Sequence, residues 1–414
     1  MGFLPCPLPC QTKKKSSDNS DQTQSRYLSS DSSSSLSLSS RSVSSLCSYP
    51  SLPSLPSFSI SSSNNFHHCL ATLTGHSSYI FCVCLSLAGK HLYSGSSNGE
   101  ILVWDSYSKE KIVCQSGSAV KSIVIMGDKL FSAHQDHRIR VWKIDNDMPN
   151  RYYKCIATLP TLNDRCMKLF WTRNYVQVRR HKKCTWVHHV DTVSALALSK
   201  DGSLLYSASW DRTFKVWRTS DFKCLESVWN AHDDAINSIV VSNNGHVYTG
   251  SADKKIKIWK KQERENKHTL MFTLEKHKSA VNALALTENG YVLYSGACDR
   301  SIIVWEKDSG SISMVVSGAL RGHKKSILCL AVVSDLVCSG SADKTVRIWK
   351  RGFGKSYSCL AVFEGHNGPV KCLNAALDRE KDDDDSCSGN SYLVYSGSLD
   401  CDVKVWKLWV PNYL

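Results

Sequence analysis

Serine, histidine and aspartate recur together along this chain, and these are the residue types that form a nucleophilic catalytic triad. The clearest set consists of His323, Ser339 and Asp343, and Trp349 follows it closely. A catalytic triad occurs once and faces a cleft, whereas these sets recur at a regular interval and each includes a tryptophan. We therefore interpret the sets as structural and predict a protein that is not an enzyme and uses no cofactor or metal ion.

The segments that position these sets repeat as well. In each copy a short strand ends at Gly-His or a remnant of it, a second strand reads Tyr-Ser-Gly-Ser or similar, and a β-branched run ends in tryptophan. The closing tryptophans are Trp104, Trp142, Trp217, Trp259, Trp305, Trp349 and Trp406. Most intervals between them are 38–46 residues, close to the ~40–45 residues of a four-stranded propeller blade, and two are longer, at 75 and 57 residues.

The repeats resemble those of the WD-repeat family, whose members are β-propellers. The resemblance covers residues 66–414 with seven copies in register, so it implies an all-β, seven-bladed β-propeller. It specifies the fold and leaves the function open. The layout, a Ser-rich head and a basic insertion after the second repeat, is similar to that of the jingubang-like WD-repeat proteins of plants, which implies a plant regulatory protein.

The resemblance also assigns a role to the recurring sets. In WD-repeat proteins the turn aspartate accepts a hydrogen bond from the Gly-His histidine, which meets a serine or threonine of the second strand, and the tryptophan indole completes the network. Such buried polar groups are tolerated because they satisfy one another. Repeats three to seven contain every member, namely His189, Ser207, Asp211, Trp217; His232, Thr249, Asp253, Trp259; His277, Ser295, Asp299, Trp305; His323, Ser339, Asp343, Trp349; and His366, Ser396, Asp400, Trp406. Repeat one has Asn98 in place of the aspartate, and repeat two has Ser116 in place of the histidine.

The two ends of the repeat region are predicted to meet. Few residues remain after Trp406, whereas residues 69–73 have the pattern of an outer strand and resemble residues 359–363. We expect the N-terminal strand to complete the last blade, which closes the ring and removes an exposed sheet edge.

Residues 1–65 form a separate region. Positions 16–65 contain 24 serines and few aromatic residues, and such a composition buries too little apolar surface to offset the entropy lost on ordering. We predict a disordered Ser-rich tail that acts as a solvated linker and can be phosphorylated. Two alternatives stay open: an organellar transit peptide, which the interspersed aspartates disfavour, and a lipid anchor at Gly2, which Cys6 at the preferred Ser or Thr position disfavours.

Composition excludes several classes of protein. No apolar run approaches the ~18–20 residues of a membrane span, so we predict no transmembrane segment. The first apolar stretch lacks a preceding basic region and is broken by Pro5 and Pro7, which argues against a secretory signal. The 18 cysteines contain no C-x-x-C pair, which argues against a zinc module and fits reduced thiols in an intracellular protein.

The formal net charge of +14 is unevenly distributed. Residues 143–190 carry a net charge of +7, half of the total, and include a basic insertion at about residues 160–184. Its Arg179, Arg180, Lys182 and Lys183 lie near aromatic residues, a mixture that binds phosphate backbones and stacks bases. Three interpretations stay open: a protein-binding loop, a passive solvated insertion, and a nucleic-acid or anionic-lipid site.

The face that this insertion occupies depends on which segment is the outer strand of the second blade. If residues 155–159 form it, the insertion leaves from the face of the Gly-His loops; if the strand lies near residues 184–187, the insertion emerges on the opposite face. An eighth blade is disfavoured, because the interval contains no further Ser-Gly-Ser-x-Asp turn. An acidic loop at about residues 378–391 interrupts the last repeat, and we expect it to be solvated rather than calcium-binding.

The resemblance also indicates surface candidates. The residue before each turn aspartate points toward the rim of the central channel in WD-repeat proteins, and Gln135 and Trp210 occupy two of these positions. Because an exposed tryptophan is a frequent interface anchor, we select Trp210, with Tyr79 near the same loops, as candidate partner-binding residues. The alternative is that Trp210 packs on a neighbouring blade.

We predict a monomeric, non-catalytic scaffold that binds other proteins in the cytoplasm or nucleus, and the plant resemblance implies transcriptional regulators among its partners. One alternative is a substrate receptor of a cullin-type ubiquitin ligase, which usually carries a Trp-Asp-x-Arg step. Here the step that begins at Trp104 and Asp105 lacks the arginine. The other alternative is binding of RNA or anionic lipid through the basic insertion.

Overall fold

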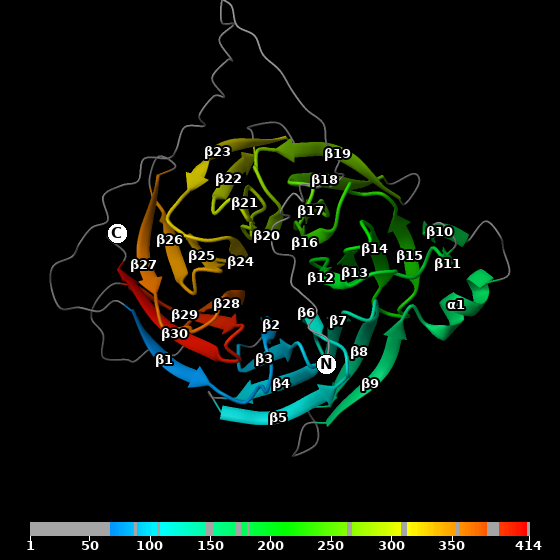
Figure 1. Cartoon of the computed structure of the whole chain (residues 1–414), viewed down its shortest axis with the longest axis horizontal. Helices are drawn as coiled ribbons and strands as arrows, with labels where there is room; N and C mark the ends of the chain where they lie inside the picture. Colours follow the sequence, from blue (N-terminus) through cyan, green and yellow to red (C-terminus); the bar gives the residue numbers. More distant parts are fainter. Residues whose placement is uncertain are drawn as a thin grey trace, which may run out of the picture. The chain divides into compact units, whose positions relative to one another are not determined.

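The computed structural model of the protein shows an all-β ring (Figure 1). It describes residues 67–86, 89–105, 108–145, 152–169, 175–179, 182–262, 267–307, 313–352, 356–378 and 389–411. Seven four-stranded antiparallel sheets, which we call blades 1 to 7, stand around a central axis. The predicted seven-bladed propeller is therefore confirmed. The predicted tail, residues 1–65, lies outside the described residues.

In blades 1 to 6 the strands follow one another in chain order from the innermost to the outermost, whereas in blade 7 the outermost strand is the N-terminal one. Blade 1 contains β2 (Ile80–Leu85), β3 (His91–Ser96), β4 (Glu100–Asp105) and β5 (Ser108–Gln115); blade 2 contains β6 (Val120–Met126), β7 (Lys129–His134), β8 (Ile139–Asp145) and β9 (Tyr152–Leu159); blade 3 contains β12 (Val193–Leu198), β13 (Leu204–Ser209), β14 (Phe214–Arg218) and β15 (Cys224–Val228). Blade 4 contains β16 (Ile236–Val241), β17 (Val247–Ser251), β18 (Lys255–Gln262) and β19 (Lys267–Glu275); blade 5 contains β20 (Val281–Leu286), β21 (Val292–Ala297), β22 (Ile302–Lys307) and β23 (Met314–Leu320). Blade 6 contains β24 (Ile327–Val333), β25 (Leu336–Ser341), β26 (Val346–Arg351) and β27 (Tyr357–Phe363); blade 7 contains β28 (Val370–Leu377), β29 (Gly389–Ser398), β30 (Val403–Pro411) and β1 (His67–Leu73).

The core lies between adjacent blades, and a contact between a β-branched residue and a glycine sets their spacing. Every innermost strand begins with a fully buried valine or isoleucine: Ile80, Val120, Val193, Ile236, Val281, Ile327 and Val370. In five places this residue packs on the glycine of the preceding blade's second strand. A Cβ atom on Gly340 would lie 2.7 Å from Cγ1 of Val370, too close for any side chain. The Ser-Gly-Ser pattern thus reflects the close approach of neighbouring blades.

The N-terminal strand closes the ring, as expected. β1 pairs with β30 in an antiparallel register that runs from His67 opposite Leu408 to Leu73 opposite Val403. Leu73 is 3% exposed and packs in one cluster with Ile80 of blade 1. A Cβ atom on Gly397 of blade 7 would lie 2.9 Å from Cγ2 of the same Ile80, so blades 7 and 1 meet like the other neighbours.

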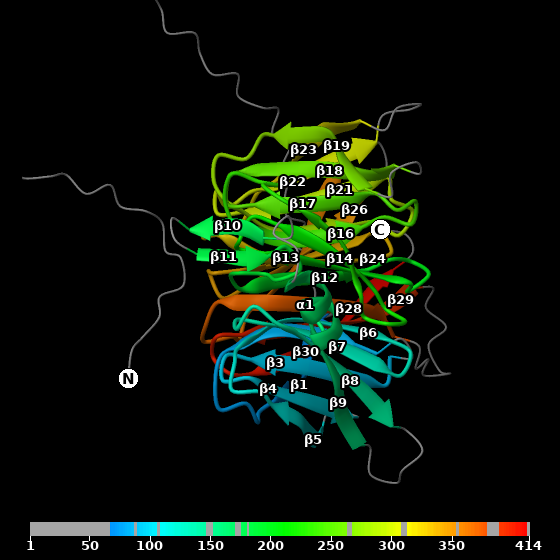
Figure 2. The ribbon, with the colours of Figure 1, turned by 90° about the vertical axis from the view of Figure 1, so that its right-hand side faces the viewer.

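The inserted segment follows β9, the outer strand of blade 2. β9 ends at Leu159 beside Ile139, at the face of the ring where the Gly-His loops lie, so the insertion leaves from that face. It contains α1 (Leu162–Leu169), β10 (Tyr175–Arg179) and β11 (Lys182–Thr185), which lie outside the ring (Figures 1 and 2). The alternative that placed the outer strand near residues 184–187 is wrong, because β11 pairs with β10 and joins no blade. Within the described residues no helix is long and apolar enough to cross a membrane.

We expect removal of β1 to destabilise the whole ring. A chain that begins at residue 74 leaves the β30 edge unpaired and exposes the cluster around Leu73, so it should unfold at a markedly lower temperature than a chain that begins at residue 67. Thermal unfolding followed by circular dichroism tests this. Equal unfolding temperatures of the two chains would show that the strand is not needed for closure.

Candidate functional site

A network of four side chains links the two loops at the Gly-His face of each of blades 3 to 7. In blade 3, the indole Nε1 of Trp217 donates to Ser207 Oγ at 2.9 Å, and Ser207 Oγ lies 2.8 Å from His189 Nε2. His189 Nδ1 lies 2.9 Å from Asp211 Oδ2. Burial lowers the pKa of His189, which favours the neutral ring. A neutral ring that accepts at Nε2 and donates from Nδ1 connects the tryptophan to the carboxylate without interruption.

The same geometry recurs with little variation. The histidine Nδ1 to carboxylate distances are 2.8–3.0 Å in the five blades. The histidine Nε2 to hydroxyl distances are 2.8–2.9 Å, and so are the indole to hydroxyl distances. These contacts bring together the predicted sets His189, Ser207, Asp211, Trp217; His232, Thr249, Asp253, Trp259; His277, Ser295, Asp299, Trp305; His323, Ser339, Asp343, Trp349; and His366, Ser396, Asp400, Trp406.

The turn aspartate also holds its own backbone. Asp343 Oδ1 accepts from the backbone N–H of Thr345, and its Oδ2 accepts from the backbone N–H of Lys324. Lys344 lies between Asp343 and Thr345 in the sequence and has a φ of 73°, in the left-handed region that non-glycine residues rarely adopt. Burial raises the pKa of Asp343, but the hydrogen bonds from Thr345 and His323 outweigh it and lower the pKa to about 2. The carboxylate is therefore charged and occupied on both oxygens.

The hydroxyl groups of these five networks are not accessible to a substrate. The hydroxyl-bearing residues Ser207, Thr249, Ser295, Ser339 and Ser396 are 0% exposed. A catalytic serine must reach the carbonyl that it attacks, so a fully buried hydroxyl that already bonds to an indole and an imidazole cannot serve. The sets stabilise the loops of this face and do not contact a ligand through these hydroxyl groups.

Blade 1 carries a reduced network. His76 Nε2 lies 2.6 Å from Ser94 Oγ, and Trp104 Nε1 donates to the same oxygen at 2.7 Å. Asn98, at the aspartate position, donates from Nδ2 to Ser77 Oγ at 2.8 Å instead of reaching the histidine. The loop and the turn are thus joined through a serine in this blade.

Blade 2 contains a histidine that the sequence interpretation missed. His134, at the end of β7, places Nε2 2.8 Å from Ser132 Oγ and Nδ1 3.2 Å from Ser116 Oγ. It occupies the place of the absent loop histidine. Asp136, without that partner, pairs with Arg140 at 2.6 Å. The signal was present, because most repeats have a serine where this one has His134.

A second feature of the Gly-His face is a group of side chains at the rim of the channel, where Lys121 lies near Phe81 and Trp210. We call these three residues, with Tyr79 in the loop that leads to Phe81, the rim cluster. Lys121 Nζ lies 3.8 Å from the ring centroid of Phe81 and 5.7 Å from that of Trp210, so side chains of blades 1, 2 and 3 converge. Trp210 is partly buried, and the cation near its ring belongs to the neighbouring blade 2. Tyr79 is 53% exposed. Phe81 and Lys121 were not predicted, since their convergence depends on how the blades stand.

Other predicted candidates lie elsewhere on the same face. Gln135 is partly buried in the turn after β7, where its backbone N–H donates to Ala119. In the insertion, Arg179 pairs with Lys182 across the β10–β11 hairpin, next to Lys183. Arg180 and the side chains of these basic residues lie outside the described part of the structure, and so do residues 379–388 of the acidic loop.

The central channel contains an open cavity of about 180 Å³ among the innermost strands. Its lining includes Cys82, Cys329 and Cys372, whose side chains are buried. Burial raises the pKa of Cys329 to about 12, so this thiol is not a reactive thiolate. Among the residues that the structure describes, no group of three or more histidine, cysteine, aspartate or glutamate side chains could hold a metal ion.

We expect Asp343→Ala to lower the free energy of unfolding by about 1–3 kcal/mol, because it leaves His323 and two backbone N–H groups without their acceptor. Denaturant unfolding measures the change. Asp221→Ala is the matched control, since Asp221 also accepts a backbone N–H two residues on, from Lys223, and pairs with Arg218, but it does so in solvent and binds no buried histidine. Its loss should therefore have a smaller effect. An Asp343→Ala protein as stable as the Asp221→Ala protein would contradict a structural role for the network.

The blade 2 network should make stability depend on pH. Burial, followed by the charge of Arg140, lowers the pKa of His134 from 6.5 to about 4. Below pH 6.5 the unfolded chain binds a proton that the folded chain excludes until about pH 4, so the free energy of unfolding falls as pH falls across this window. We expect His134 to contribute about 2 kcal/mol of the loss between pH 7 and pH 5. Denaturant unfolding of His134→Ser should show a smaller loss than the parent, and an equal loss would disprove the assignment.

Comparison with known proteins places this architecture in a family. The description "WD domain, G-beta repeat" matches residues 67–105, 181–218, 222–260, 268–306, 314–350 and 357–407, more than half of the chain. The small ribosomal subunit protein RACK1 of Drosophila melanogaster is 34% identical over 108 residues, which are 25% of this chain and 32% of that protein. The cross-pathway control WD-repeat protein 2 of Flammulina velutipes is 26% identical over 251 residues, 54% of this chain and 76% of that protein.

A plant relative is the autophagy-related protein 16 of Arabidopsis thaliana, 27% identical over 194 residues, which are 46% of this chain and 36% of that protein. The alignments with RACK1 and with autophagy-related protein 16 thus span about a third of each protein's length. Seven blades, recurring Trp-Ser-His-Asp networks and six matches to one repeat description show that this chain belongs to the WD-repeat family of β-propeller proteins.

Proposed function

We propose that this protein is a non-catalytic scaffold that binds other proteins through the Gly-His face of its propeller. The observation that carries the proposal is the rim cluster of Tyr79, Phe81, Lys121 and Trp210. Three consecutive blades contribute to it, so a partner that covers it contacts all three at once. Aromatic side chains beside a cation combine apolar area with a fixed charge, and such residues dominate the binding energy of many interfaces.

The networks support this role by fixing the loops that carry the cluster. Trp210 directly precedes Asp211, whose carboxylate is bound by His189 and by the backbone N–H of Val190. The backbone N–H of Trp210 donates to Thr192 at 3.0 Å, which ties its turn to the preceding loop. A loop that is already ordered loses little conformational entropy when a partner binds.

The finer part of the proposal concerns the setting. The Ser-rich head at residues 1–65, the propeller at 66–414 and the basic insertion resemble the layout of jingubang-like plant proteins, so we propose a plant regulatory protein in signalling or transcriptional control of development. Its partners would then include transcriptional regulators in the cytoplasm or nucleus.

The test is quantitative affinity purification with the full-length chain and with Trp210→Ala. We expect the variant to recover the partners of the parent at about a tenth of the amount or less, because a central aromatic anchor is lost. Tyr291→Ala is the matched control, since Tyr291 is also an exposed aromatic, 59% exposed and beside Lys307, but lies directly before β21 on the opposite face. Equal recovery by Trp210→Ala and the parent would refute the role of the rim cluster.

A further inference from the structure

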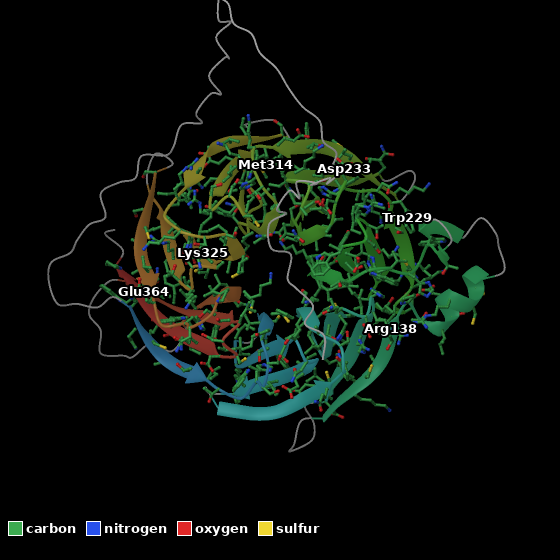
Figure 3. The ribbon with its side chains drawn as sticks, in the orientation of Figure 1. Arg138, Trp229, Asp233, Met314, Lys325 and Glu364 are labelled. Carbon is green, nitrogen blue, oxygen red and sulfur yellow. The ribbon has the colours of Figure 1, made fainter. Side chains whose placement is uncertain are left out.

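The exposed charges on the Gly-His face are unevenly distributed among the blades. In the loop before β16, His232 is followed by two exposed acidic residues, Asp233 and Asp234, whereas in the loop before β24 the equivalent residues are Lys324 and Lys325. Figure 3 labels Asp233 and Lys325 on different parts of the ring. Exposed cations are most numerous in the loops of blades 5 and 6, which carry Lys276, Lys278, Arg300, Arg321, Lys324, Lys325 and Lys344. The turns of blades 2, 3 and 4 carry one each, namely Arg138, Arg212 and Lys254.

The acidic residues in these loops are already engaged. Asp299 and Asp343 bind His277 and His323, and each also accepts the backbone N–H that follows its histidine. Glu275 pairs with Lys255 of blade 4 at 3.4 Å. The loops of blades 5 and 6 therefore present a positive surface, although the charges come from segments that are separate in the sequence.

A pocket opens within this surface at the outer edge of blade 5. Its volume is about 70 Å³. Its rim includes Lys276, Lys278 and Arg321, all exposed, and its floor is formed by Ile303, Val316, Gly318 and Ala319 of β22 and β23. Asp299 and Ser301 complete the lining, and the Asp299 carboxylate is bound there by His277, by the backbone N–H of Lys278 and by the Ser301 hydroxyl. The pocket is thus apolar at the bottom and cationic at the mouth.

Blade 5 departs from the neighbouring blades 4 and 6 at one position in the floor of this pocket. Two residues before the closing tryptophan, five other blades carry a basic residue: Arg140, Lys215, Lys257, Arg347 and Lys404. In blade 4, Lys257 extends to the loop and donates from Nζ to Ala231 O at 2.7 Å. In blade 3, Lys215 does the same with Trp186 O at 2.6 Å. Blade 5 has Ile303, which is 6% exposed and too short to cross this space.

We propose that this pocket binds an acidic peptide of a partner protein. An aliphatic side chain of the peptide occupies the floor over Ile303 and Val316, and carboxylates or phosphates on either side of it pair with Lys278 and Arg321. The pocket suits one small side chain, and its cations stand where the flanking charges must lie. The lining contains no aromatic residue on which a nucleobase could stack, which favours a peptide over a single-stranded nucleic acid.

This inference goes beyond the proposed function and does not depend on the rim cluster, which lies over blades 1 to 3. Trp210→Ala in the same assay should therefore bind the acidic peptide as tightly as the parent does. The failure of one proposal leaves the other intact, because each concerns its own residues and its own readout.

The experiment measures binding of fluorescein-labelled peptides to the full-length protein by fluorescence polarisation. The carboxylate probe is Gly-Glu-Glu-Asp-Leu-Glu-Glu-Gly, and the phosphate probe replaces the glutamates next to the Asp-Leu step with phosphoserine. We expect the double variant Lys278→Glu with Arg321→Glu to weaken binding of the tighter probe about tenfold or more. Its matched control, Lys90→Glu with Lys200→Glu, changes the net charge equally at two exposed lysines of the opposite face and should bind like the parent.

A second variant separates the pocket from simple charge attraction. Ile303→Lys restores the residue type of five other blades, fills the floor and adds a positive charge. Occupation of the pocket predicts weaker binding of the leucine probe, whereas non-specific attraction predicts tighter binding. The same peptide with serine in place of leucine should bind the parent more weakly.

Three results would overturn the proposal. They are equal binding by the two double variants, tighter binding by Ile303→Lys, and a labelled oligouridine that binds better than both peptides and is lost in the Lys278→Glu with Arg321→Glu variant. Circular dichroism melts of each variant confirm that the ring remains folded during the measurement.

Discussion

The surface of the Gly-His face depends on the hydrogen bond between a loop histidine and a turn aspartate. A buried carboxylate is costly unless its oxygens are satisfied, and here His189 and the backbone of Val190 supply donors to Asp211 while Thr213 supplies others. The bond joins two loops that belong to different connections of the chain. Residues next to it, such as Trp210 and Lys278, are therefore held where a partner can meet them.

Much of this structure could be predicted from the sequence because the propeller repeats one structural unit, a four-stranded blade with its hydrogen-bond network. The tryptophan spacing indicated seven blades, and the residues of each network were identified by their place in the repeat. The exceptions lie in blades where a different residue completes the network. His134 enters its network from the second strand rather than from the loop, and only the geometry of β7 shows that its ring reaches Ser132.

The distribution of charge shows a second limit of sequence interpretation. The distribution of charge along the chain indicated only the insertion, where basic residues are close together in the sequence. The cations above blade 5 are scattered over several turns, and the propeller brings Lys278 and Arg321 to one pocket. Isoleucine is an ordinary residue for a buried strand, so the sequence alone gives Ile303 no special role. Its relation to the pocket follows from the comparison with Lys215 and Lys257, which cross the equivalent space in blades 3 and 4.

The pairing of β1 with β30 has a consequence for how the protein is made. β1 leaves the ribosome before any other described strand, and its partner is among the last to appear. Until then six blades can form in order, but the valine and isoleucine surfaces between blade 1 and blade 7 have nothing to pack on. Completion of the ring is thus a late event over a very long chain separation, and until it occurs these apolar surfaces are open to contact with other chains.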